Sequence, residues 1–242
     1  MTQDTDRPES STEQPSQAAL NFREEDSAIA SKLIRARRTS KVLASEGQQI
    51  TYPHADEQQM KEQVLQAIAD GGFAPFHFDR CVEDIAEPWR FYMLQQSDCR
   101  EIGRNLAHWF SDIRPGNKLS AMLNACGCLV LVTWLPQFGW AADADKKQIQ
   151  IDEEHLAAAA AATQNLLLSL TAKNLRTYWS SGGFFRTAEM FDRLQIDKSE
   201  KLLSAIFVNP RDTNEAVEVL PGKHNSNRSQ PDRWTRTINI KQ

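Results

Sequence analysis

The residues best suited to chemistry begin with a basic run, Arg37-Arg38-Thr39-Ser40-Lys41. Arginine makes bidentate contacts with phosphate oxygens, and a hydroxyl such as that of Thr39 adds a directional donor. The run could therefore hold the phosphate of a cofactor. On composition alone, the solvated basic end of a helix is the commoner explanation, so other residues must decide between the two interpretations.

Three later segments combine aromatic, imidazole and glycine residues. They are Ala74-Pro75-Phe76-His77, Pro88-Trp89-Arg90-Phe91 and Trp179-Ser180-Ser181-Gly182-Gly183. The glycines let the backbone approach a planar ligand closely and expose N–H groups to it. Taken singly, each segment has a plainer explanation, namely a surface histidine, a core strand and a helix-terminating turn.

In this order and at roughly these separations, the four segments resemble the nitroreductase family of FMN-dependent oxidoreductases, and most closely its YdjA-type branch. The resemblance covers residues 28–212. It implies a ping-pong reaction in which NAD(P)H reduces FMN and leaves, after which a nitroaromatic, a quinone or a similar small acceptor takes the electrons. The flavin ring carries the electrons, so the resemblance implies no catalytic acid, base or nucleophile.

The resemblance also implies roles for individual residues. Arg37, Arg38 and Thr39 match the family's Arg-Arg-Ser, and Lys41 would lie near the pyrimidine edge of the flavin. His77 matches a histidine that contacts FMN. A backbone N–H or seryl hydroxyl of the later turn would bind the N5/O4 edge, with a tryptophan beside the ring. The complete predicted cofactor-binding set is Arg37, Arg38, Thr39, Lys41, His77, Trp179, Ser180, Ser181 and Gly182.

The chain departs from the family pattern around His77. Phe73 stands where close relatives provide an arginine across the dimer, and the segment Phe78–Glu87 is longer than the pattern. We expect this acidic insertion to reshape the mouth of the pocket and to alter the choice of substrate. Many family members also place a C-terminal Lys or Arg on the phosphate, but the sequence does not select among its candidates, Lys223, Arg228, Arg233 and Arg236.

Hydrophobic periodicity predicts the elements that position these segments. We expect helices from about Asp26 to Leu43, from Asp56 to Gly71, from Ser97 to Ile113 and from Asp152 to Lys173, with Ser97 and Asp152 as N-caps. We expect strands at Pro88–Leu94, Cys128–Trp134, Leu203–Val208 and Trp234–Ile240. Because helices and strands do not alternate regularly, the predicted fold class is α+β. The resemblance implies a nitroreductase-like fold, with a central mixed or antiparallel sheet of about four or five strands flanked by helices, in an intertwined dimer.

Two further features concern packing. The longest predicted helix contains an unbroken run of alanines, Ala157–Ala162, and is apolar nearly all round. Such a helix is buried, and its thin surface lets another helix approach closely, in the core or across a dimer interface. Free cysteines usually behave as small buried hydrophobes. We expect this of Cys126 and Cys128 in preference to half of a metal site, since no second Cys or His pair follows at zinc-finger spacing.

Composition limits the remaining functions. Of 242 residues 40% are hydrophobic and the net charge is −4, which suits a folded protein and argues against nucleic acid and membrane surfaces as partners. Residues 1–27 carry few apolar side chains and are expected to form a disordered tail. Residues 28–242 are expected to form a single FMN-binding domain, with 213–242 as an extension that the partner subunit could exchange. No signal-peptide core is found, so the cytoplasm is the expected location.

Two alternatives stay open. The chain could bind FMN and sequester or sense it without efficient turnover, as Phe73 and the insertion would permit if they close the pocket. It could instead be a structural dimer without flavin, in which the basic run is merely solvated. Replacement of Arg37, Thr39 and His77 separates these alternatives, because only the flavin-binding ones predict a loss of flavin retention.

Overall fold

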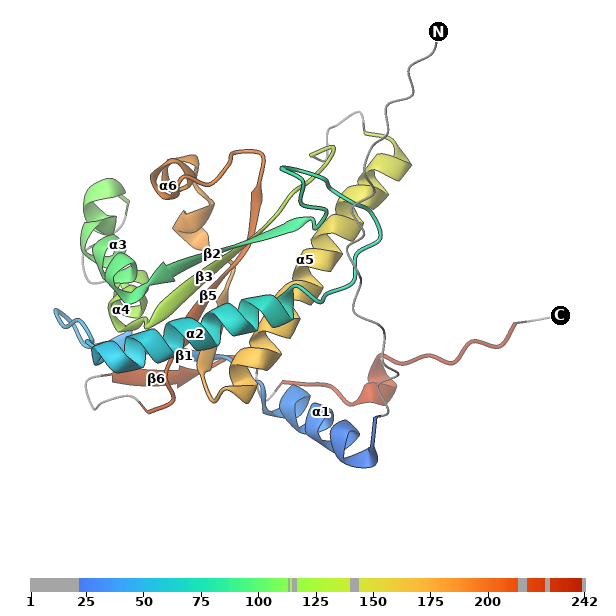
Figure 1. Ribbon diagram of the computed structural model, residues 1–242, viewed down its shortest axis with the longest axis horizontal. Coiled ribbons are helices and arrows are strands. Elements are labelled where there is room, and N and C mark those ends of the chain that lie inside the picture. The colour runs from blue at the N-terminus through green and yellow to red at the C-terminus, as the bar shows by residue number, and fades with distance from the viewer. Residues whose placement is uncertain are drawn as a thin grey trace, which may run out of the picture.

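A computed structural model describes residues 22–112, 114, 117–139, 144–212, 217–224 and 227–240. Within them the chain forms a four-stranded sheet, a two-stranded sheet and helices around both (Figure 1). The helices are α1 (Glu24–Ala36), α2 (His54–Gly71), α3 (Gln96–Trp109), α4 (Lys118–Ala125), α5 (Lys146–Ala172), α6 (Ala188–Leu194) and the short 3₁₀ helices η1 (Gly183–Arg186) and η2 (Pro231–Arg233). The strands are β1 (Ser40–Ala44), β2 (Trp89–Gln95), β3 (Cys128–Trp134), β4 (Arg176–Ser180), β5 (Lys201–Asn209) and β6 (Val217–Pro221).

The larger sheet has the strand order β2-β3-β5-β4, and each of its neighbouring pairs is antiparallel. Side chains from α3, α4 and α6 form the core on one face, and side chains from α2 and α5 form it on the other. Every residue of β3 is buried, because the strand lies inside a sheet covered on both faces. The predicted α+β class, with a four-stranded sheet flanked by helices, is confirmed.

The alanine run makes a close helix contact inside the protomer. A Cβ added at Gly71 of α2 would lie 3.2 Å from the carbonyl oxygen of Ala162 in α5, and 3.3 Å from Cζ of Phe91. Ala158, Ala159 and Ala162 are all buried. The small side chains of α5 therefore let α2 approach closely. Of the two predicted reasons for the alanine run, helix packing inside the core explains these alanines.

The basic run lies outside any helix. α1 ends at Ala36, Arg37 is its C-cap, and the chain then becomes extended to form β1. β1 pairs with β6, with Val42 opposite Val219. The prediction of one helix reaching Leu43 was wrong. The backbone of this segment forms strand hydrogen bonds with β6, which lies far along the chain, and local periodicity does not reveal such a partner.

Two helices begin at residues other than those predicted. α5 begins at Lys146 after Asp145, whose Oδ1 accepts from the N–H of Gln148 at 2.9 Å, so Asp152 is not its N-cap. α3 begins at Gln96 rather than after Ser97. Several side-chain oxygens near a helix start compete for the same unpaired N–H groups, and their order in the sequence does not decide which one caps. The prediction that this helix extends to Ile113 was wrong, because α3 ends at Trp109 and its C-cap Phe110 is already extended.

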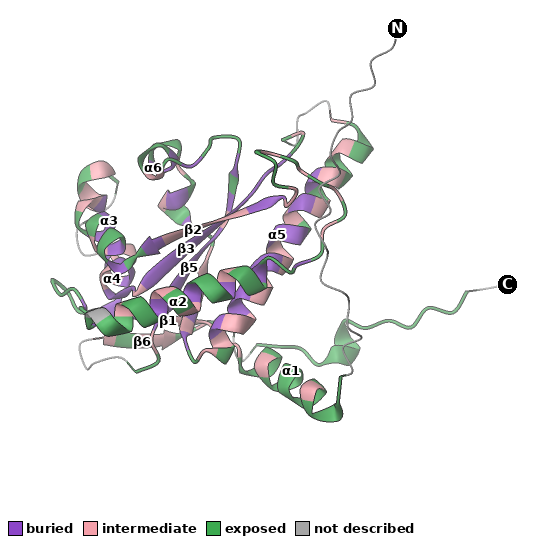
Figure 2. Cartoon of the chain, in the orientation of Figure 1, coloured by how far each residue is buried: buried purple, intermediate pink, exposed green. Residues whose placement is uncertain are grey.

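Both ends of the described chain are exposed. α1, which includes the last residues of the predicted disordered tail, has no buried residue (Figure 2). Residues 234–240 form no strand, and Trp234, Ile238 and Ile240 are 68%, 84% and 90% exposed. The predicted strand Trp234–Ile240 was wrong for a single protomer, since its alternating pattern meets no neighbouring strand. Residues 1–21 lie outside the described residues. Among those described, no helix combines the length and apolarity needed to cross a bilayer.

Candidate functional site

The basic run and the edge strand β4 lie side by side. Thr39 and Thr177 form an isolated parallel bridge, and Nζ of Lys41 lies 4.7 Å from the ring centroid of Tyr178. The carbonyl of Thr39 also accepts from the N–H of Gly222 at 2.9 Å. Two of the segments expected to share a site are thus brought to one edge of the sheet.

Positive charge gathers at the end of α1. Burial lowers the pKa of the half-buried Arg37, and the charges of Arg228 and Arg38 lower it further. Arg38 donates from Nη1 to the carbonyl of Arg37 at 3.0 Å. Within the described residues, none of the three guanidinium groups forms an ion pair with a carboxylate. Like charges held together in this way disfavour one another, so an anion placed among them would be stabilised.

The segment after β4 makes a turn that requires glycine. Gly182 has a φ of +101°, and a Cβ there would lie 2.3 Å from Cδ2 of Leu202. Its N–H donates to Oγ of Ser180 at 3.2 Å. The carbonyl of Ser181 accepts from Nε of Arg186 at 2.5 Å, while Ser181 itself is exposed. The N–H of Gly182 is already engaged and Gly182 is buried, so Ser181 and Gly183 are the accessible residues of the turn.

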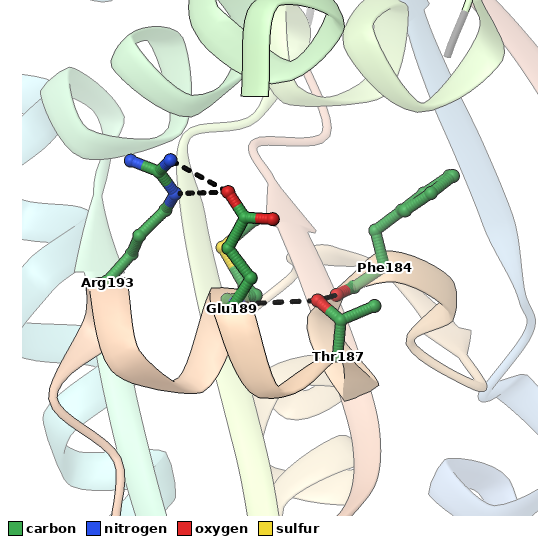
Figure 3. A network of polar contacts seen from close by, with 5 residues as sticks. Phe184, Thr187, Glu189 and Arg193 are labelled. Carbon is green, nitrogen blue, oxygen red and sulfur yellow. Dashed lines mark hydrogen bonds and ion pairs between the residues drawn. The ribbon is translucent and has the colours of Figure 1, made fainter. Parts of the chain in front are cut away.

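A polar network fixes the backbone that follows this turn (Figure 3). The hydroxyl of Thr187 donates to the carbonyl of Phe184 at 2.8 Å and accepts from the N–H of Met190 at 3.2 Å, which caps α6. Glu189 and Arg193 form an ion pair of 2.8 Å on the exposed side of α6. The geometry of the Gly182 turn is therefore set from both sides, by β4 and by the capped helix.

His77 lies in a loop that is away from the basic run. It is exposed in the loop between α2 and β2, and Figure 1 shows this loop at the end of the sheet where β2 begins, away from α1 and β1. Its neighbours face inward: Ala74 is buried, and the ring of Phe76 meets Trp89 edge to face with centroids 5.6 Å apart. Trp89 is buried, so the interpretation of its segment as core is confirmed. One protomer does not bring His77 to the basic run.

Two residues that the sequence did not select lie with the basic run. Arg228 was one of four C-terminal candidates, and only the path of the chain brings its charge to Arg37. Tyr178 precedes Trp179 on β4, so the two side chains point to opposite faces, and Tyr178 is the one that meets Lys41. The alternation of side chains along a strand could have pointed to Tyr178 from the sequence alone. Arg228 had no local signal.

The prediction of buried thiols is confirmed. Cys99, Cys126 and Cys128 are buried. A hydrogen bond with Cys126 and burial raise the pKa of Cys99, and burial together with Cys126 raises that of Cys128. A raised pKa keeps the thiols of Cys99 and Cys128 protonated and unreactive. Cys81, in the insertion, is exposed.

Comparison with known structures agrees with this architecture. A nitroreductase-like family protein from Bacillus cereus is similar at a TM-score of 0.60 and 19% identity, over 88% of this chain and 96% of its own. A candidate nitroreductase from Desulfovibrio desulfuricans, in complex with FMN, is similar at a TM-score of 0.52 and 18% identity, over 87% and 96%. A nitroreductase family protein from Streptococcus pneumoniae TIGR4 gives 0.53 and 14%, over 86% and 100%. At these identities the likeness shows the fold.

Family membership is shown by the sequence itself. No curated protein sequence matches the chain. A model of the family described as "Nitroreductase family" matches residues 54–208, which is more than half of the 242 residues. The fold described above is the nitroreductase-like fold predicted for it. The chain belongs to the nitroreductase family.

Proposed function

We propose that the chain is an FMN-dependent oxidoreductase that takes electrons from NAD(P)H and passes them to a nitroaromatic, a quinone or a similar small acceptor. The observation that carries the proposal is the cluster of Arg37, Arg38 and Arg228, which has no carboxylate partner in the described part of the chain. A structural dimer without flavin gives no reason to gather two further cations around the half-buried Arg37. Placement in the YdjA-type branch rests on the four sequence segments alone.

The residues at this edge of the sheet fit a flavin mononucleotide. The three guanidinium groups would hold the phosphate, whose negative charge offsets their mutual repulsion. Thr39 would add its hydroxyl, and Lys41, held over Tyr178, would approach the ring from the same side. Next to the Gly182 turn, the exposed Gly183 has nothing within 4 Å of the place a Cβ would take, so its backbone is open to a ligand near the exposed Ser181. When bound, FMN would supply the hydride and electron transfer that no side chain of this set can perform.

The same proposal includes a homodimer in which each site draws on both chains. The loop that carries His77 and the helix α1, whose C-cap is Arg37, lie apart in one protomer (Figure 1), so a second copy would bring His77 to the arginine cluster. Large exposed apolar side chains support an interface: Phe73 beside the His77 loop is 86% exposed, and Ile34 of α1 and Ile238 near the C-terminus are 60% and 84% exposed. Residues 213–242 would then pack on the partner as an exchanged extension.

The visible spectrum of the purified protein, followed anaerobically with NADH and then NADPH, tests the enzyme proposal. We expect a flavin spectrum that bleaches with a nicotinamide donor and returns when a nitroaromatic or a quinone is added. Flavin that stays oxidised would favour the sequestering alternative, which shares the arginine cluster. Failure to bind added FMN would refute both and leave the structural dimer.

Light scattering on the flavin-loaded protein tests the shared site. We expect twice the mass of the 242-residue chain. A monomer that retains FMN would contradict the role of His77 across the dimer, because no second chain would be present to supply it.

A further inference from the structure

The insertion Phe78–Glu87 is folded onto its own chain. The N–H of Arg80 donates to the carbonyl of Ala86 at 2.8 Å and closes the loop. The guanidinium of Arg90, in β2, donates to the carbonyl of Val82 at 3.0 Å and so attaches the insertion to the sheet. The insertion therefore has a defined structure, and its backbone polar groups are tied to the body of the protein.

The side chain of Arg80 joins the insertion to the loop after β3. Its Nε donates to the carbonyl of Leu135 at 3.2 Å, and its Nη2 donates to the carbonyl of Pro136 at 3.1 Å. That loop is tied to α5 in turn, because the buried carboxylate of Asp152 accepts from the N–H of Gln137 at 2.6 Å. One path of polar contacts thus runs from α5 through the loop to the insertion.

His155 makes a second connection from α5. It is 1% exposed, and its Nε2 lies 3.2 Å from the carbonyl oxygen of Phe78. A carbonyl oxygen only accepts, so Nε2 carries the proton of the neutral ring. Burial lowers the pKa of His155, which keeps the ring neutral near pH 7 although Asp152 lies nearby. Phe78 directly follows His77, so this bond fixes the backbone beside the predicted flavin ligand.

We propose that Arg80, Asp152 and His155 form a latch that positions His77 for the flavin site of the partner subunit. This inference rests on the proposed function. The three latch residues are positioning residues, since they hold the loop and touch no ligand. Phe76, which precedes His77, packs inward, and the carbonyl of Phe78, which follows it, is hydrogen-bonded. The latch therefore holds the backbone of His77 in one position, with its side chain directed outward. A histidine that is already ordered binds a ligand without the entropic cost of ordering a loop.

Arg80→Ala is the first test, because Arg80 is only partly buried and its removal leaves the core intact. In flavin-free protein, we expect hydrogen exchange of the amides of residues 76–80 to rise about tenfold, with exchange in β3 unchanged. We expect the Kd for FMN to rise about tenfold, because the net loss of one or two hydrogen bonds weakens binding by about that factor. The kcat measured at saturating FMN should stay unchanged. His155→Gln, which removes the second connection, should act in the same direction.

Arg104→Ala is the matched control. Arg104 is an exposed arginine on α3 whose guanidinium reaches Oε1 of Gln49 at 3.4 Å. Its removal should alter neither the exchange of residues 76–80 nor the Kd for FMN.

A double-mutant cycle with His77→Ala separates positioning from general destabilisation. If Arg80 acts through His77, Arg80→Ala should weaken FMN binding in the wild-type background and add nothing in the His77→Ala background. Equal losses in both backgrounds would overturn the inference, as would an unchanged Kd or a His77→Ala variant of wild-type affinity. Failure of the wild-type protein to bind FMN would instead remove the proposed function, and hydrogen exchange of the flavin-free protein would still report whether Arg80 holds the segment.

Discussion

Thr39 and Thr177 are partners in a parallel bridge that joins the basic run to β4, the edge strand of the four-stranded sheet. The four-stranded sheet is otherwise antiparallel, so this bridge is a local contact between two separate sheets. It places Lys41 against Tyr178 and puts the arginine cluster at the same edge as the Gly182 turn. Side chains at this edge can therefore be replaced to test ligand binding while the core stays as it is.

Arg37→Gln and Arg228→Gln should each weaken FMN binding. A charge-assisted hydrogen bond contributes about 1.5–3 kcal/mol, so we expect the Kd from fluorescence titration to rise roughly 10- to 100-fold. The flavin-free variants should be as stable as the wild type or slightly more stable, because each change removes one of three mutually repelling charges.

Arg104→Gln, remote from the cluster, is the control for these variants. If either cluster variant bound FMN as tightly as the wild type, the cluster would not be the phosphate site. If both lost stability in the flavin-free form, the guanidinium groups would have a structural role that the described contacts do not include.

Gly182→Ala should destabilise the protein more than Gly183→Ala. Both glycines have positive φ, at +101° and +51°, but only at Gly182 would a new Cβ collide with Leu202, while nothing lies within 4 Å of a Cβ at Gly183. We expect a loss of about 1 kcal/mol for Gly183→Ala, from the left-handed backbone alone, and about 3 kcal/mol for Gly182→Ala. Urea unfolding measures both. Equal losses would show that Leu202 moves aside.

One thiol should react in the folded protein. Of the four cysteines, Cys81 is exposed, and the other three are buried. Burial raises the pKa of Cys128, and a hydrogen bond with Cys126 and burial raise that of Cys99, so both stay protonated. A chromogenic thiol reagent should label one group natively and four in denaturant. The native signal should disappear in Cys81→Ser, and a second fast-reacting thiol would contradict the packing of the core.

Tyr92→Phe should change how stability depends on alkaline pH. The hydroxyl of Tyr92 donates to Oε1 of Glu200 at 2.6 Å, and the hydroxyl of Thr133 donates to the other carboxylate oxygen. Burial raises the pKa of Tyr92 above 10.0, and the bond to Glu200 raises it further. The folded protein therefore binds this proton more tightly than the unfolded chain does. The resulting stability is complete below pH 10.0 and is lost as the pH rises from there toward the folded pKa.

Urea midpoints between about pH 8 and pH 11 test this dependence. The Tyr92→Phe variant should be less stable near neutral pH by about 1 kcal/mol, and its stability should fall less steeply above pH 10. Tyr178→Phe is the control, because the hydroxyl of Tyr178 makes no hydrogen bond within the described residues. Identical pH profiles for wild type and Tyr92→Phe would mean that folding does not raise the pKa of Tyr92.

The sequence by itself determined the features that depend on local pattern. The apolar run of β3, the end of α2 at Gly71 and the burial of Cys126 and Cys128 were all predictable, because each follows from the composition of a few adjacent residues. The segments with chemistry were also identifiable, since their residue types and order resemble one family, and the family model confirms that membership.

Only the tertiary structure decided the features that depend on distant partners. β1 is a strand because β6 pairs with it, and Asp152 receives backbone N–H groups from another loop although it precedes the alanine run of α5. Arg228 reaches Arg37 through the course of the C-terminal chain, and the loop that carries His77 lies apart from α1 (Figure 1). Contacts between residues far apart in sequence leave no periodic trace in either segment, so local patterns locate the candidate residues and the fold decides which of them meet.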